Sequence, residues 1–154
     1  MAKQQPTGIP IHVLEIPTTS VQLLVPSASV AEVVNVRDFT RVPQMPKWCL
    51  GVIAWRSRAV PVISFETLLG DAEPWIGPKS KVLIFFPIPG RQAFEFFGVL
   101  STSEPQPHNI AMTSEMAAKS PRDSQYIASG LNIRGRVVGI PNMEALKQAF
   151  YPTA

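Results

Sequence analysis

Four arginines are the residues of this sequence best suited to chemistry or binding, and they come in two closely spaced pairs. Arg56 and Arg58 interrupt the apolar stretch GVIAWRSRAVPVISFETLL at residues 51–69, and Arg134 and Arg136 interrupt a second apolar stretch. A guanidinium group binds carboxylates, phosphates or aromatic faces. Each pair therefore indicates a catalytic or nucleic-acid site, a solvated turn, or a contact for a partner protein.

The other residue types that carry chemistry are few and scattered. His12, His108 and the single cysteine, Cys49, lie far apart in the sequence, and no CxxC or HExxH spacing occurs. A metal site needs clustered ligands, so we expect no metal. The glycine-rich phosphate loops and the GxSxG nucleophile motif are also missing from the sequence. We therefore expect neither a cofactor nor an enzyme; a hydrolase or isomerase with an unrecognised site is the enzymatic alternative.

The bulk composition indicates one globular domain that binds other proteins. The chain has 154 residues, 45% of them hydrophobic, and 14 Lys+Arg against 11 Asp+Glu give a net charge of +3. This small excess is not gathered into a basic stripe, so nucleic acid is not the expected partner. The N-terminus lacks the apolar core of a secretory signal, and no uninterrupted apolar stretch of membrane-spanning length occurs. We expect a cytoplasmic protein.

Sixteen prolines indicate a strand-rich domain, because they exclude long helices and separate short apolar runs. The continuous apolar runs are typical of strands that are buried on both faces or closed into barrels. Helices are predicted at 64–70, after a capping Ser64, and at 141–151, with Asn142 as the cap. Residues 101–124 are predicted to be a long loop with at most a short helix near 112–119. We expect one domain over residues 11–152, preceded by a flexible segment at 1–10. The predicted strands are 11–16, 21–25, 33–36, 52–55, 60–63, 82–86, 94–100, 126–133 and 136–140, with a hairpin connection at 87–92.

An internal repeat relates the two arginine pairs. When Arg134 is aligned on Arg56, WRSRAVPVISFETL lies over IRGRVVGIPNMEAL. Both copies predict a strand, a tight turn with arginines on either side, a second strand, a helix cap and a short helix, so we expect two similar β subdomains. Arg58, Arg134 and Arg136 are then expected to be solvated turn charges. The identical pairs are Arg56/Arg134, Arg58/Arg136, Val60/Val138, Glu66/Glu144 and Leu68/Leu146.

Residues 24–69 resemble CheW, the adaptor family of bacterial chemotaxis arrays. LLVPSASVAEVV is similar to a strand followed by the V-x-E-V pattern of the family, with Glu32 at its acidic position. RVPQMPKWCLGVIAWRSRAVPVISFETLLG is similar to the signature of two prolines three apart, a glycine, and an apolar strand that ends in Arg-Gly before P-V-I. Arg56 falls on the arginine of the family. QYIASGLNIRGRVVGI resembles the second half of the family more loosely.

Three departures indicate a divergent member of the family. Ser57 replaces the glycine after the arginine, Ser64 and Phe65 replace Asp-Leu, and the polar STSEP at 101–105 replaces an apolar stretch. Divergent CheW-like proteins also serve chemosensory systems that control type IV pili and twitching motility.

This resemblance implies two small five-stranded, SH3-like β-barrels with an intertwined chain, a short C-terminal helix and no enzymatic activity. The family bridges methyl-accepting receptors and the regulatory domain of the CheA histidine kinase, and it reaches membrane arrays only through the receptors. A receptor helix would lie in a groove lined by Val30, Glu32, Ile53 and Arg56. Glu32 is the expected charge partner of Arg56.

The alternative of a different class is a small β-barrel that binds single-stranded nucleic acid. Its arginines would contact phosphates and its aromatic rings would stack on bases. The residues concerned are Arg56, Arg58, Arg134 and Arg136, with Trp48, Trp55 and Phe94.

Overall fold

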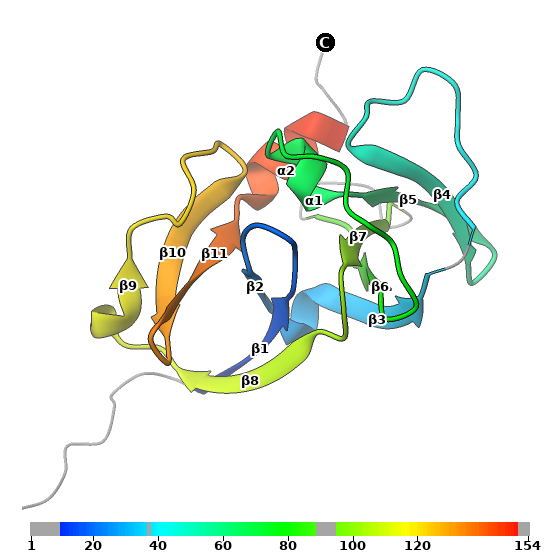
Figure 1. Ribbon diagram of the computed structural model, residues 1–154. Coiled ribbons are helices and arrows are strands. Elements are labelled where there is room, and N and C mark those ends of the chain that lie inside the picture. The colour runs from blue at the N-terminus through cyan, green and yellow to red at the C-terminus, as the bar shows by residue number, and fades with distance from the viewer. Residues whose placement is uncertain (1–9, 37, 89–94, 151–154) are drawn as a thin grey trace, which may run out of the picture.

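Two antiparallel-rich sheets stand side by side, with two short helices over one end of the gap between them (Figure 1). The computed structural model describes residues 10–36, 38–88 and 95–150. The mainly β fold predicted from the sequence is confirmed. The first sheet contains β1 (Pro10–Ile16), β2 (Leu23–Pro26), β8 (Gln106–Ala111), β9 (Ala117–Ala118), β10 (Ile127–Ile133) and β11 (Arg136–Pro141). The second sheet contains β3 (Val30–Asn35), β4 (Cys49–Trp55), β5 (Arg58–Ile63), β6 (Lys81–Phe85) and β7 (Phe97–Ser101).

The order of strands is the same in both sheets, which explains the repeat in the sequence. The second sheet is ordered β3-β6-β7-β5-β4, and the first is ordered β8-β1-β2-β11-β10, with the two-residue β9 added at its edge. In both sheets the fourth strand is parallel to the third, and the other pairs are antiparallel. The N-terminal hairpin β1–β2 therefore completes the sheet formed by the C-terminal half, and this is the intertwining expected from the resemblance.

Three hydrophobic clusters fix this arrangement, one within each sheet and one shared. Along β6, Val82 and Ile84 belong to the cluster of the second sheet, whereas Leu83 and Phe85 belong to the shared cluster. Alternate side chains of a strand point to opposite faces, so a strand buried on both faces needs a continuous apolar run. The expectation that such runs mark doubly buried strands is confirmed here.

Both predicted helices are present and begin at the expected caps. The Ser64 hydroxyl accepts a hydrogen bond from the Thr67 amide at 3.2 Å, before α1 (Phe65–Leu68). The Asn142 side chain accepts from the Ala145 amide at 3.1 Å, before α2 (Met143–Phe150). These side chains satisfy amides that the first turn of a helix leaves unpaired. Pro141 ends β11 rather than starting the helix, and Tyr151 lies outside the described residues.

The predicted long loop at 101–124 is wrong, because it contains β8, a 3₁₀ turn at Ser114–Met116 and β9. β8 hydrogen-bonds to β1 on one side only and forms an edge of the sheet, with Pro107 opposite Leu14. A proline has no amide hydrogen and is tolerated on an edge strand, where one side of the backbone needs no partner. The prolines and polar residues of this segment therefore mark an edge strand.

The two arginine-bearing turns have the same backbone geometry. Arg56 and Ser57 have φ angles of 47° and 62°, and Arg134 and Gly135 have φ angles of 50° and 81°. Two consecutive positive φ angles are typical of the two-residue turn that matches the twist of a β-hairpin. Ser57 adopts the conformation that glycine takes in the second copy, so its replacement of glycine preserves the turn.

A bidentate ion pair joins segments from the two halves of the chain. Arg122 donates to both carboxylate oxygens of Asp71, at 2.7 and 2.8 Å, and also to the Leu69 carbonyl oxygen at 3.2 Å. The hydrogen bond from Arg122 lowers the pKa of the Asp71 carboxyl below its ordinary value.

Among the described residues, no helix has the length and apolar character needed to cross a lipid bilayer.

Candidate functional site

An exposed ion pair connects the two edge strands of the second sheet. Glu32 comes from β3, and Arg56 comes from the turn between β4 and β5. Arg56 Nη2 lies 2.9 Å from Glu32 Oε1, while the indole Nε1 of Trp55 donates to Glu32 Oε2 at 3.3 Å. The Arg56 guanidinium also lies over the Trp55 ring, 4.7 Å from its centre. The predicted pairing of Glu32 with Arg56 is present in the structure.

The Glu32–Arg56 pair remains accessible to solvent although Trp55 contacts both of its members. The exposed fractions are 65% for the Arg56 side chain and 40% for that of Glu32. Beside them lies a hollow of about 320 Å³, lined from β3 by Glu32, Val34 and Asn35 and from β4 and its turn by Ile53, Ala54, Trp55 and Arg56. Fixed charges at the lip of a partly apolar hollow are suited to orienting a protein partner.

The four residues predicted for partner binding do not all lie in this hollow. Glu32, Ile53 and Arg56 line it. Ile53 is buried and belongs to the core of the second sheet, so it supports the hollow from below. Val30 begins β3, is half-buried, and packs against the core shared by the two sheets. A role of these residues in partner binding stays a prediction.

Sequence reasoning missed a chain of aromatic and cationic contacts beside the ion pair. The Trp55 ring lies 5.0 Å from that of Phe96, which lies 5.9 Å from that of Phe86, and the Arg58 guanidinium lies 5.1 Å from the centre of the Phe96 ring. We call Trp55, Arg58, Phe86 and Phe96 the cation–aromatic ladder. Phe86 and Phe96 flank the connection between β6 and β7, so no periodic pattern in the sequence links them to Arg58.

In the second copy the arginines have different surroundings. Arg136 donates to both carboxylate oxygens of Glu15, from Nη1 at 2.6 Å and from Nη2 at 2.7 Å, and Nε2 of His108 lies 3.0 Å from the same carboxylate. Arg136 is half exposed, as expected of a turn charge, but it is not a free one, because it neutralises the buried carboxylate of Glu15. This contact lowers the pKa of Glu15 and raises that of Arg136. Arg134 lies at the turn and is exposed.

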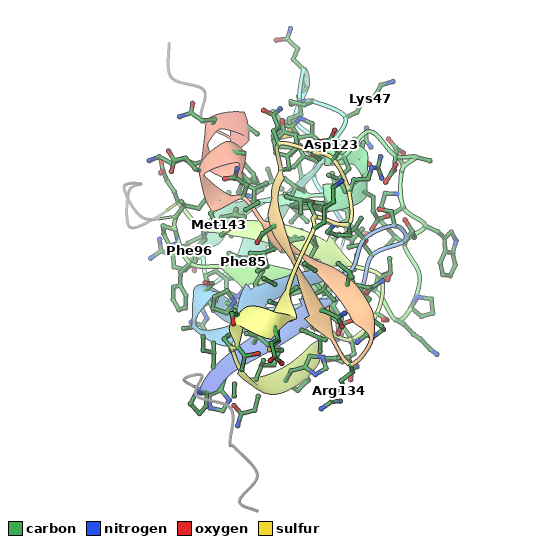
Figure 2. The ribbon with its side chains drawn as sticks, turned by 90° about the vertical axis from the view of Figure 1, so that its left-hand side faces the viewer. Lys47, Phe85, Phe96, Asp123, Arg134 and Met143 are labelled. Atoms are coloured by element: carbon green, nitrogen blue, oxygen red, sulfur yellow. The ribbon has the colours of Figure 1, made fainter. Side chains whose placement is uncertain are left out.

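The geometry disfavours the nucleic-acid alternative. Arg56 and Arg58 belong to one sheet, whereas Arg134 and Arg136 belong to the other, so the four arginines form no continuous track. Figure 2 shows Phe96, which stacks beneath Arg58, at a different edge of the molecule from Arg134.

Two of the aromatic rings proposed as stacking platforms are packed against other side chains, and the third lies outside the described residues. The Trp55 ring is buried under Arg56, and the Trp48 ring packs edge-on against Phe150 with centres 5.7 Å apart. Phe94 lies outside the described residues. Stacking of successive bases needs exposed ring faces along one groove.

The enzymatic alternative finds no support in the titratable groups. Among the residues that the structure describes, no three metal-ligating side chains come together. Cys49 lines a surface hollow with residues 41–47, but burial raises the pKa of its thiol above the ordinary value. A raised pKa disfavours the thiolate, which is the reactive form. The groups with lowered pKa values, Glu15 and Asp71, are held in ion pairs with arginines.

The two sheets share a core and carry an accessible ion pair beside an open hollow, which is a surface suited to binding a protein partner. Comparison with known proteins gives the family: residues 13–149 match the CheW-like domain. This chain belongs to the CheW-like family, whose members are non-enzymatic scaffolds of chemotaxis signalling.

Two individual proteins are similar to this chain, one in structure and one in sequence. The scaffolding protein TtCheW from Thermoanaerobacter tengcongensis has a similar structure, with a TM-score of 0.70 over 87% of this chain and 90% of that chain, at 17% sequence identity. Protein FrzA from Myxococcus xanthus is 32% identical over 63 residues, which are 41% of this chain and 39% of FrzA. The first comparison establishes the fold, and the second covers well under half of either protein.

Proposed function

We propose that this chain is a chemosensory adaptor that couples methyl-accepting receptors to a CheA-type histidine kinase, with the Glu32–Arg56 pair facing the receptor. The exposed ion pair between β3 and the β4–β5 turn carries the proposal, because Glu32 and Arg56 stand where the sequence resembles the family signature, inside the matched domain. The proposal treats residues 11–152 as one working unit in the cytoplasm. Its contact with membrane arrays is through receptors.

The contacts of Arg56 support a binding role in physical terms. The guanidinium is positioned by Glu32 on one side and by the Trp55 ring on the other, so little side-chain freedom is lost when a partner binds. Several guanidinium donors of Arg56 remain available, because its hydrogen bond to Glu32 uses Nη2 alone. A charge held this way at a surface sets the orientation and choice of partner.

We also propose that the pathway is one that controls surface motility through type IV pili. The departures from the family signature at Ser57, Ser64 and 101–105 support a specialised member of the family. A deletion strain tested for twitching and for swimming separately would decide this. Loss of swimming alone would contradict it.

The test of the receptor contact uses Arg56→Ala, Arg56→Glu and the matched control Arg134→Glu. Each variant is mixed with the cytoplasmic hairpin of a receptor and, separately, with the regulatory domain of the kinase, both from the same genome. Arg56→Glu is expected to weaken receptor binding by about tenfold or more, the scale of one lost charge-assisted contact. Arg134→Glu makes the same charge change at the equivalent turn and is expected to bind as wild type.

A charge swap separates contact with a partner from an effect on folding. The double variant Glu32→Arg, Arg56→Glu can form the internal ion pair with reversed polarity. If Arg56 contacts the receptor, the double variant stays weak. Wild-type binding by the double variant would show that the pair only joins β3 to the turn, and the receptor contact would then lie elsewhere.

A further inference from the structure

The cation–aromatic ladder lies at one end of the second sheet and continues the surface of the Glu32–Arg56 pair. Trp55 belongs to both, because its indole nitrogen contacts Glu32 while its ring contacts Phe96. Phe86 ends the ladder on the other side, where its amide donates to the Ser29 carbonyl oxygen at 3.0 Å, next to the start of β3. The ladder is therefore a row of neighbouring rings that runs from the β4–β5 turn to the end of β3 at Val30.

The two arginines of this surface differ in their charge balance. Arg56 is neutralised by Glu32, whereas no carboxylate among the described residues lies within ion-pair distance of Arg58. Arg58 is exposed, and its guanidinium lies over the Phe96 ring. A guanidinium that lies on a ring keeps its N–H groups, which point outward in its own plane, free for a carboxylate.

Phe86 adds an apolar contact surface beside this unneutralised charge. Its exposed fraction is 48%, which is large for a phenylalanine in a folded domain. Aromatic residues and arginine are the types enriched at the centres of protein interfaces. The ladder offers both types within one continuous set of contacts.

We propose that the ladder extends the receptor contact and binds an acidic helical segment, which places a carboxylate on Arg58 and an apolar side chain on Phe86. This inference rests on the proposed adaptor function, and it names residues of this chain beyond the family signature. Continuity through Trp55 favours the receptor as the partner, because a helix 10–12 Å wide can cover neighbouring groups on both sides of that residue. The kinase domain is an outcome that the test distinguishes.

A protein segment fits the ladder better than a nucleic acid does. Binding to phosphates needs several unneutralised cations, since each contact adds a counterion-release contribution. Here only Arg58 is without a carboxylate partner among the described residues of the ladder and the adjoining pair, and Trp55 is buried. One carboxylate and one apolar anchor match the charge and the exposed ring that are present.

The experiment measures the affinity of the receptor's cytoplasmic hairpin for wild type, Arg58→Glu, Arg58→Gln and Phe86→Ala. Arg58→Gln removes the charge and leaves a shorter, neutral polar side chain, and Arg134→Glu is the control for a general change in charge. Arg58→Glu is expected to weaken binding by tenfold or more, with a smaller dependence on salt concentration than wild type shows. Phe86→Ala is expected to weaken it by about fivefold to tenfold. Far-UV circular dichroism and urea unfolding establish that each variant is folded.

The outcomes separate this inference from the proposed function. If Arg56→Glu weakens receptor binding while the Arg58 and Phe86 variants bind as wild type does, the adaptor function stands and the ladder contact is refuted. If none of these variants changes receptor binding, the ladder contact and the receptor contact of Arg56 are both refuted, and the receptor binds elsewhere on this chain. If the Arg58 and Phe86 variants lose binding to the kinase domain but not to the receptor, the assignment of the ladder to the receptor is overturned. Salt-sensitive binding of a 20-nucleotide single strand that Arg58→Glu abolishes would overturn it in favour of nucleic acid.

Discussion

Replacing Arg136 with alanine should destabilise the fold more than replacing the acid it pairs with. Glu15 has an exposed fraction of 5% and receives two hydrogen bonds from Arg136 and a contact from His108. The Arg136 side chain is half exposed. Arg136→Ala therefore leaves a buried carboxylate with His108 as its remaining polar contact among the described residues, whereas Glu15→Gln leaves a guanidinium that water can still reach.

The magnitude follows from that difference in burial. Removing one partner of a buried ion pair costs about 3–5 kcal/mol, and the exposed half of Arg136 reduces the effect to about 2–3 kcal/mol. Glu15→Gln keeps the shape and removes only the charge, so we expect about 1 kcal/mol. In the Glu15→Gln background, Arg136→Ala should cost much less than it does in wild type, because the carboxylate that it neutralised is gone.

The penalty of Arg136→Ala should also depend on pH in a direction that the structure fixes. Arg136 lowers the pKa of Glu15 in the folded protein, so the pair contributes its full stability above the ordinary glutamate pKa of about 4.3. That contribution is lost as the pH falls through the lowered pKa of the folded state. The difference between wild type and Arg136→Ala should therefore be largest near pH 7 and shrink below about pH 4.

Urea unfolding at pH 7 and at pH 3.5, followed by tryptophan fluorescence and circular dichroism, measures these differences. The expected loss at pH 7 corresponds to a fall in melting temperature of about 4–12 °C for a domain of this size. Arg134→Ala is the matched control, because it removes an exposed arginine two residues away. Equal penalties for Arg136→Ala and Glu15→Gln, or a penalty that is the same at both pH values, would refute the role assigned to this pair.

Two further predictions concern the hairpin turn and the second helix. Ser57→Gly should stabilise the protein by about 1 kcal/mol, because Ser57 has a φ angle of 62° that glycine adopts without strain; an unchanged or lower urea midpoint would contradict this. Asn142→Ala should cost about 1 kcal/mol, since it removes the side chain that accepts the Ala145 amide at the start of α2. Asn142→Ser, which retains a capping oxygen, is the control and should cost much less.

Much of the fold could be predicted because local and long-range signals in the sequence agree. The repeat pairs Arg56 with Arg134, and both copies fold into a strand, a two-residue turn, a strand, a capped end and a helix. Ser64 and Asn142 are small polar residues directly before apolar segments, which is the ordinary signature of a helix start. These features depend on neighbours in the chain, so the sequence reveals them.

The contacts that sequence reasoning missed depend on strands that are distant in the chain. β8 was overlooked because its single buried apolar residue, Ile110, and its Pro107 do not resemble a core strand. Only its pairing with β1 makes it one. Likewise, Phe86 and Phe96 approach Trp55 and Arg58 through the order of strands in the second sheet. The spacing of residues along the sequence does not record that order.

The duplicated arginines show how one framework can separate a structural role from a binding role. Arg58 and Arg136 occupy equivalent positions after equivalent turns, yet Arg58 lies over a ring at the surface and Arg136 is fixed to the buried Glu15. An arginine that neutralises a buried carboxylate is unavailable to a partner. If it left the ion pair, the carboxylate would stay buried without a compensating charge, and the fold would be destabilised. Arg58 has no such carboxylate among the described residues. The first copy therefore has a cation that a partner can engage without destabilising the fold, and the second copy has one whose loss should be measured as stability.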